Sequence, residues 1–411
     1  MDPKYNRVKY ACYTAAMTMS VTGNLSPILF LTFRSLYGIS YSLLGLLILI
    51  NFVSQLIIDL IFSFFSHKFN IEKTVKSIPV ISSVGFLIYG IWPFVFPDHV
   101  YVGLVLGTIV FSAASGLSEV LMSPVIAAVP AKDPDREMSK LHSAYAWGVV
   151  FMVVISTVFL FLAGSHNWQW LVFLFLLIPV SSAIMFAGST VPPMETPERA
   201  SGALKLLRNS GVWLSVFAIF LGGAAECTMA QWCSGYLEQA MGIPKLWGDL
   251  FGVALFSVML GIGRSWYAKK GRNIEKVLSF SMIGAMACYL LAAVSAVSWI
   301  GLIACAMTGL CTAMLWPGNL VVASDRFPQG GVFIYALMAA GGDLGASVAL
   351  QLVGIVTYAA IAAPKVAALA KSLALTPEQL GMKLGMLCGM LFPLAGIFIS
   401  LRIWKGNPKR K

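Results

Sequence analysis

Long apolar stretches alternate along the whole chain with short segments that carry charges, proline or glycine. A membrane-spanning helix needs about 20 apolar residues, and most of these stretches show no polar face of the kind found on helices of soluble proteins. The pattern predicts an all-α membrane protein with twelve spanning helices. We expect them at residues 9–33, 41–65, 76–96, 99–129, 141–163, 168–190, 210–240, 246–267, 275–296, 299–323, 332–362 and 379–403.

Two motifs of the first half of the chain recur in the second half. Asn70–Lys73 and Asn273–Lys276 both read Asn-Ile-Glu-Lys, 203 residues apart. Gly116–Pro124 in the fourth apolar stretch and Gly309–Pro317 in the tenth both begin with Gly-Leu and end in Pro, 193 residues apart. The matches indicate a duplicated six-helix unit. Parallel repeats of this size are typical of the major facilitator architecture, with the substrate site at the middle of the membrane between the halves.

The placement of lysine and arginine predicts that both chain ends are cytoplasmic. In that orientation 23 of the 28 cations fall in inner segments, and the exceptions are Arg34, Lys245, Lys365, Lys371 and Lys383. Inner loops of membrane proteins carry such an excess. We therefore expect an N-terminal six-helix bundle at 1–192, a cytoplasmic linker at 193–209 and a C-terminal six-helix bundle at 210–411. The expected location is a cell membrane, in particular a bacterial inner membrane.

Composition narrows the class of protein further. Hydrophobic residues make up 58% of the chain and charged residues 11%, against about 25% charged in soluble domains. This balance excludes a disordered chain, a disulfide scaffold and an ordinary cytosolic enzyme. The net charge of +11 is spread over every inner loop and not gathered in one patch, so no nucleic-acid partner is expected. The seven cysteines lie in apolar stretches without a CxxC pair, and we expect them to be small buried hydrophobes.

No catalytic constellation is present in the sequence. A phosphate-binding GxxxxGK[ST], a GxSxG nucleophile elbow and a His/Cys cluster with metal-ligand spacing are all missing. We therefore expect neither an enzyme nor a bound cofactor or metal, and no ATP hydrolysis by this chain.

Three acidic residues fall near the middle of predicted membrane helices: Glu119, Glu226 and Asp343. A charge in hydrocarbon is costly, which makes such a residue a functional candidate. No Lys or Arg is expected at that depth, so we expect these acids to lack a cationic partner. A desolvated carboxyl can bind a proton from one side and release it on the other. We expect proton coupling through these three residues; a sodium site, or neutralisation by a buried arginine or by hydroxyls, is the alternative.

Amide, hydroxyl and aromatic side chains accompany these acids on the same helix faces. Ser112, Ser115, Glu119 and Ser123, for example, follow 3/4/4 spacing. Such groups bind carbohydrates by hydrogen bonds and ring stacking, although hydroxyls and amides equally often only connect neighbouring helices. The expected substrate-binding residues are Asn24, Glu119, Ser123, Glu226, Gln231, Trp232, Trp316, Asn319, Asp343 and Gln351.

A second group of charged residues is expected at helix ends. Asn51, Gln55 and Asp59 repeat every four residues towards the inner membrane face, with Lys68 just beyond them, and Arg264 lies near the corresponding place of the second half. A carboxylate at a helix end can pair with a cation or a helix terminus and hold one conformation closed. We interpret Asp59, Lys68 and Arg264 as gating residues.

Three short segments resemble the fucose permease branch of the major facilitator superfamily, the proton-linked sugar symporters: Asn24–Leu29, Gly90–Pro93 and Glu119–Pro124. The last is similar to that family's Glu-Val-x-x-Asn-Pro motif, which implies a role for Glu119 in proton and sugar handling. Two departures matter. Pro27 stands where the family has a helix 1 aspartate, and Ser123 replaces the asparagine of the motif. Coupling would then fall on Glu119 alone or be shared with Glu226 or Asp343.

These observations together predict a secondary active transporter, a proton-coupled symporter of a small polar solute such as a monosaccharide that works by alternating access. The alternatives are a proton-coupled exporter of amphipathic or cationic compounds and a membrane sensor that transports nothing; uniport and sodium coupling also stay open. The expected partners are the solute, protons or Na+, and the lipid bilayer. We expect a monomer.

Overall fold

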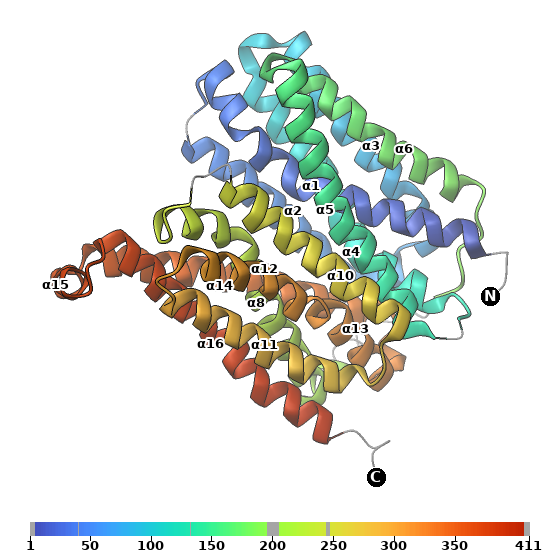
Figure 1. The fold of residues 1–411 in the computed structure, drawn as a ribbon. Helices are drawn as coiled ribbons and strands as arrows, with labels where there is room; N and C mark the ends of the chain where they lie inside the picture. Colours follow the sequence, from blue (N-terminus) through green and yellow to red (C-terminus); the bar gives the residue numbers. More distant parts are fainter. Residues whose placement is uncertain (1–4, 40, 132, 195–204, 244–246, 407–411) are drawn as a thin grey trace. The chain divides into compact units, whose positions relative to one another are not determined.

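Every regular element of the described part of the chain is a helix (Figure 1). The computed structural model describes residues 5–39, 41–131, 133–194, 205–243 and 247–406. The first six long helices are α1 (Asn6–Tyr37), α2 (Tyr41–Phe65), α3 (Ile71–Val95), α4 (Val100–Ala128), α5 (Pro134–Ala163) and α6 (Trp168–Ala187). Short 3-10 turns at Ser66–Lys68, Pro97–His99 and Ser165–Asn167 connect some of them.

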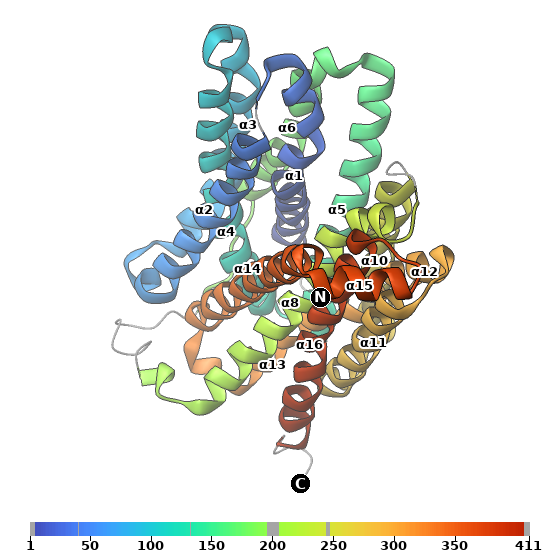
Figure 2. The same ribbon diagram turned by 90° about the vertical axis from the view of Figure 1, so that its left-hand side faces the viewer.

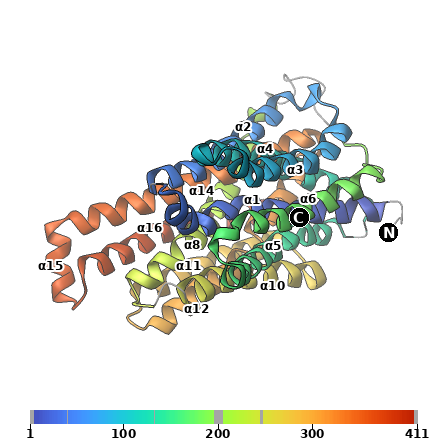
Figure 3. The ribbon, with the colours of Figure 1, turned by 90° about the horizontal axis from the view of Figure 1, so that it is seen from above.

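The second half contains α8 (Ser210–Gln239), a π-helical segment (Gly248–Ala254) that continues into α10 (Leu255–Lys270), α11 (Ile274–Val294), α12 (Ser298–Thr312), α13 (Leu315–Arg326), α14 (Val332–Ala362), α15 (Pro364–Ser372) and α16 (Pro377–Lys405). Two features differ from the predicted helices. The tenth predicted helix is divided into α12 and α13, and the short helix α15 connects α14 with α16 (Figure 3).

The predicted all-α membrane fold is confirmed. Ten helical stretches of the described residues are long and apolar enough to cross a membrane. The helices α1 and α2, with 32 and 25 residues, occupy the positions of the first two predicted spans. The helices are this long because each must cross about 30 Å of hydrocarbon and satisfy all of its backbone hydrogen bonds internally.

Contacts divide the chain into two compact units. The first contains residues 1–208 and 327–340, and the second contains residues 209–326 and 341–411. The border at 208/209 lies at the end of the expected linker, whose residues 195–204 are outside the described part of the chain, whereas the division within α14 is not part of the expected scheme. The expected six-plus-six boundaries stay a prediction, and each unit is described by itself below.

Two local features are shared by the units and support the duplication. Asn70 begins α3 by accepting a hydrogen bond at its side chain from the backbone N–H of Lys73 at 3.0 Å. Asn273 begins α11 in the same way with Lys276 at 3.2 Å. The side-chain oxygen satisfies one of the N–H groups that the first helical turn leaves without a partner.

Glycine also brings equivalent helices together in each unit. A Cβ on Gly116 of α4 would lie 3.0 Å from Ile58 and 3.1 Å from Gln55 of α2. A Cβ on Gly309 of α12 would overlap the carbonyl oxygen of Phe256 in α10. In the first unit α4 packs against both α2 and α3 (Figure 2). The glycines therefore set the distance at which the second and fourth helices of each half cross.

The core of the first unit is aromatic. Trp168 at the start of α6 is fully buried, and its ring centroid lies 4.9 Å from that of Phe33 in an edge-to-face arrangement. Its indole N–H donates to the Tyr37 hydroxyl at 3.0 Å, and the buried Tyr89 and Ser26 hydroxyls lie 3.0 Å apart. Buried aromatic groups need such partners for their polar atoms, and here they connect α1, α3 and α6.

Candidate functional site

The serine stripe of α4 serves mainly to connect helices of the first unit. The Ser112 hydroxyl donates to Asn51 Oδ1 at 2.6 Å, and the same oxygen accepts a hydrogen bond from Gln55 Nε2 at 3.0 Å. The hydroxyls of Ser115 and Thr22 lie 2.5 Å apart, and both residues are buried. Interhelical hydrogen bonds of this kind hold α1, α2 and α4 together inside the bundle. They also fix the backbone that carries Glu119.

Two carboxylates meet in this part of the first unit. An oxygen of Asp59 on α2 and an oxygen of Glu119 on α4 lie within 4.8 Å of each other. Asp59 is fully buried and Glu119 is half-buried. The sequence interpretation treated Asp59 as a helix-end residue separate from Glu119, whereas the fold brings the two acids together. Gly116, one turn before Glu119, allows α2 to approach closely enough for this.

Three further predicted residues of the first unit lie elsewhere. The buried Ser123 hydroxyl is 3.5 Å from His142 Nε2 on α5. The Asn24 amide donates to the carbonyl of Ser20 in its own helix at 2.8 Å. Lys68 is exposed, with its ammonium 5.0 Å from the centroid of the Phe65 ring. The positions of Ser123 and Asn24 fit helix packing as well as substrate binding, and the roles of all three residues stay predictions.

Glu226 of the second unit has a cationic partner. Arg264 Nη2 lies 2.8 Å from Glu226 Oε1, and the arginine is only 2% exposed. The expectation that no Lys or Arg reaches this acid is therefore wrong. The sequence pattern assigned Arg264 to the cationic inner segment that follows and therefore placed it near the inner membrane face. In the structure it lies just past the middle of α10, on the face that meets α8 and the end of α12.

Arg264 makes a second contact that explains its place. Its Nε–H donates to the carbonyl oxygen of Ala313 at 2.9 Å. In a continuous helix that carbonyl would accept from the N–H of residue 317, but Pro317 has none. The helix divides at this point, because α12 ends at Thr312 and α13 begins at Leu315. Arg264 thus satisfies a backbone carbonyl that proline leaves without its helical donor, and it neutralises Glu226.

The first turns of α13 carry the aromatic and amide candidates. A Cβ on Gly342 of α14 would lie 2.5 Å from the Trp316 indole, and one on Gly223 of α8 would lie 3.1 Å from it. The outer edge of the half-buried Trp316 ring therefore lies against both glycines. The Asn319 amide donates to the carbonyl of Leu315 at 2.6 Å and is buried.

Glu226 follows Gly223 by three residues and therefore lies one turn along the same face of α8. Its second oxygen, Oε2, is buried and has no hydrogen-bond partner within the described residues. A buried carboxylate oxygen of this kind is an acceptor for a hydroxyl or ammonium group.

The remaining candidates of the second unit are less closely grouped. Asp343 follows Gly342 directly and is half-buried, and its backbone carbonyl accepts from the Ser347 hydroxyl at 2.8 Å. The half-buried Trp232 lies against α14, where a Cβ on Gly354 would be 3.4 Å from the indole. Gln231 and Gln351 are exposed. The structure thus groups Glu226 and Arg264 by direct contact, and it places Trp316 and Asn319 on the neighbouring α13.

Sequence reasoning missed two parts of this arrangement. It did not pair Glu226 with Arg264, and it did not identify the carbonyl of Ala313 as a ligand of Arg264. One signal was available: a proline four residues after Ala313 leaves that carbonyl without its usual donor. The proximity of Asp59 and Glu119 had a weaker signal, namely Gly116 close to Glu119 in a helix that must pack against another.

Comparison with known proteins settles the family. A model of the Major Facilitator Superfamily matches residues 11–350. The chain belongs to the Major Facilitator Superfamily. It is therefore a multi-pass membrane transporter, as the apolar helices indicate. No curated protein matches the sequence significantly in a direct comparison.

Solved structures of this superfamily share the fold. The E. coli fucose:proton symporter superposes with a TM-score of 0.72 at 15% identity, covering 96% of this chain and 99% of the other. A proton:xylose symporter gives a TM-score of 0.73 at 12% identity over 98% and 96% of the two chains. A human organic anion transporter gives 0.66 at 11% identity over 97% and 100%. At such identities the likeness concerns the fold, and the predicted resemblance to the fucose permease branch is confirmed at that level.

Proposed function

We propose that this superfamily member is a proton-coupled symporter that carries a small polar solute of the monosaccharide class by alternating access. The observation that supports the proton part is the close approach of Asp59 and Glu119 inside the first unit. Coulomb repulsion between two carboxylates at this distance is relieved when the pair binds a proton or a cation. A site that gains and loses one positive charge with little rearrangement is suited to ion coupling.

The second unit supports the solute part of the proposal. Glu226 Oε2 is available to accept from a hydroxyl group, and the Trp316 ring offers a flat apolar surface on the neighbouring helix. The Asn319 amide hydrogens are partly engaged with the backbone, which leaves its carbonyl oxygen as a further acceptor. Acceptors together with an aromatic face suit a sugar, whose hydroxyls donate hydrogen bonds while its C–H face packs on the ring. Two structural neighbours are sugar:proton symporters, which agrees with this class.

Substrate-dependent proton movement in proteoliposomes tests the proposal. Purified protein with a pH-sensitive dye in the lumen is given L-fucose, D-xylose and other sugars, nucleosides, organic acids and organic cations in turn. We expect one class of small polar solutes to acidify the lumen. The variant Glu119→Gln removes the charge without changing the shape and should abolish this acidification. The matched control is Glu72→Gln, because Glu72 pairs on the surface with Lys76 and should not affect transport. Solute uptake without proton movement in the unmodified protein would overturn the coupling.

Export of cationic compounds is the second candidate, favoured by the same pair of carboxylates. Two nearby acids attract an organic cation as well as a proton. In the assay above, a lipophilic cation would then release protons from preloaded vesicles, and sugars would have no effect. Replacement of protons by Na+ in the buffers separates sodium coupling from proton coupling in either case.

A further inference from the structure

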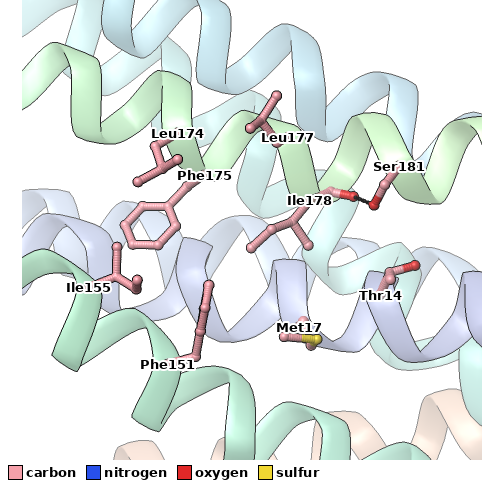
Figure 4. A pocket seen from close by; sticks show the side chains of 9 residues that line it. All are labelled: Thr14, Met17, Phe151, Ile155, Leu174, Phe175, Leu177, Ile178 and Ser181. Atoms are coloured by element: carbon pink, nitrogen blue, oxygen red, sulfur yellow. Dashed lines mark hydrogen bonds between the residues drawn. The ribbon is translucent and has the colours of Figure 1, made fainter.

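A pocket of about 320 Å³ opens on the surface of the first unit between α1, α5 and α6 (Figure 4). Its walls are mostly apolar and include Met17 of α1, Phe151 and Ile155 of α5, and Leu174 and Leu177 of α6. The rim is open, because Phe151 is 44% exposed and Leu177 is 62% exposed. None of these residues takes part in the proposed proton or solute sites.

The two hydroxyl groups at one end of the pocket are turned away from it. Thr14 Oγ1 donates to the carbonyl of Ala11 at 2.9 Å, and Ser181 Oγ donates to the carbonyl of Ile178 at 2.7 Å. The pocket therefore presents hydrocarbon to an occupant and no free donor from these two residues. Since α5 and α6 are membrane-spanning helices, the material that surrounds this opening is the acyl region of the bilayer.

A cation lies just beyond the end marked by Thr14 and Ser181. Arg7 precedes Thr14 by seven residues on α1, about 10 Å along the helix at 1.5 Å per residue. Its Nη2 donates to the carbonyl of Ile184 at 2.8 Å, three residues after Ser181 on α6. A Cβ on Gly188 would overlap the Arg7 guanidinium, so glycine makes room for it. The exposed guanidinium is thus held one to two helical turns beyond the pocket.

We propose that this pocket and Arg7 form a binding site for an anionic phospholipid, with one acyl chain in the pocket and the phosphate on the guanidinium. Guanidinium groups bind phosphate with directed hydrogen bonds. The acyl chain alone confers no preference, because bulk lipid is as apolar as the pocket. The headgroup contact therefore decides which lipid stays bound. Tyr10, 61% exposed on the turn after Arg7, adds an aromatic side chain of the kind that lies at the level of lipid headgroups.

Native mass spectrometry of the detergent-solubilised protein tests this site. The protein is mixed with equal amounts of dioleoylphosphatidylglycerol and dioleoylphosphatidylcholine, and the lipids retained on gas-phase release are counted. We expect one phosphatidylglycerol to be retained at least tenfold more strongly than phosphatidylcholine. Arg7→Gln should remove that preference, Arg7→Lys should keep part of it, and Ile155→Trp should fill the pocket and lower retention of both lipids. Arg402→Gln, which removes an exposed arginine from α16, should change nothing.

Three results would overturn the proposal. The first is an unchanged preference for phosphatidylglycerol in Arg7→Gln. The second is full lipid retention in an Ile155→Trp variant that elutes and melts like the unmodified protein. The third is displacement of the retained lipid by sn-glycerol 3-phosphate, since that would show an anion site that does not use the pocket. Arg7 lies on the surface, so its variants report on the site even where Ile155→Trp does not fold.

Discussion

At the scale of single residues, the contact between Glu226 and Arg264 changes the role that can be assigned to each of them. An acid in a membrane helix without a partner is a candidate for proton binding, but this acid shares a short ion pair with an arginine that is 2% exposed. Proton binding at Glu226 would leave the arginine charge buried without compensation. In the proposed mechanism we therefore assign solute hydroxyls to Glu226 Oε2 and proton coupling to the first unit, where Asp59 and Glu119 approach each other.

The ion pair also makes a prediction about stability. Arg264→Leu removes the partner of a buried carboxylate and the donor to the carbonyl of Ala313. Loss of one partner of a buried pair lowers the free energy of unfolding by about 3–5 kcal/mol. The double variant Glu226→Leu with Arg264→Leu should recover part of this loss, because no buried charge is left. Unfolding of the detergent-solubilised protein by denaturant gives both values, with Arg402→Leu as the surface control. A single variant as stable as the unmodified protein would contradict the buried pair.

At the scale of helices, the repeated Gly-to-Pro motif has different consequences in the two units. In the first unit α4 passes through Pro124 without interruption. In the second unit the chain divides into α12 and α13 four residues before Pro317, and Arg264 takes up the released carbonyl. The same motif thus lies in a continuous helix in the first unit and at a break in the second, where Arg264 contacts the released carbonyl. Proline alone therefore does not decide whether a helix divides.

Glycine-to-alanine substitutions test the helix crossings. A Cβ at Gly309 would overlap a backbone carbonyl, which cannot move without shifting α10. A Cβ at Gly116 would meet Gln55 and Ile58 at about 3 Å, so smaller shifts suffice. We expect Gly309→Ala to lower the free energy of unfolding by about 1–3 kcal/mol and Gly116→Ala by less.

Gly23 of α1 is the matched control, because a Cβ there would meet nothing within 4 Å. Gly23→Ala should be neutral, or stabilising by up to about 1 kcal/mol, since alanine is the better helix former. Melting temperatures of the three alanine variants, measured under the same conditions, test the expected order of stability. If Gly23→Ala destabilised the protein as much as Gly309→Ala, the destabilisation would not come from the helix crossings.

At the scale of the whole molecule, the fold was predictable and the contacts were not. Apolar length determines the spanning helices because hydrocarbon tolerates no unsatisfied backbone, and the repeated Asn70 and Asn273 caps mark equivalent helices. Depth along a helix, in contrast, does not determine which side chains meet. Asp59 and Arg264 were both placed near the inner membrane face by counting residues. The structure places Asp59 close to Glu119 and Arg264 beside Glu226. Such pairings depend on how helices cross, for example at Gly116, which no single-helix pattern shows.

If Asp59 and Glu119 hold one exchangeable proton together, their contributions to coupling are not additive. Removing either carboxylate takes away the repulsion that drives proton binding, so Asp59→Asn and Glu119→Gln should each abolish substrate-driven proton movement. The double variant should then transport no fewer protons than either single variant, and solute exchange, which needs no net proton movement, should survive in all three. The dye assay with vesicles measures the first quantity and counterflow of labelled solute the second. Asp98→Asn, at an exposed turn, is the matched control for Asp59→Asn. Full proton movement in Asp59→Asn would remove Asp59 from the mechanism and leave Glu119 to act without it.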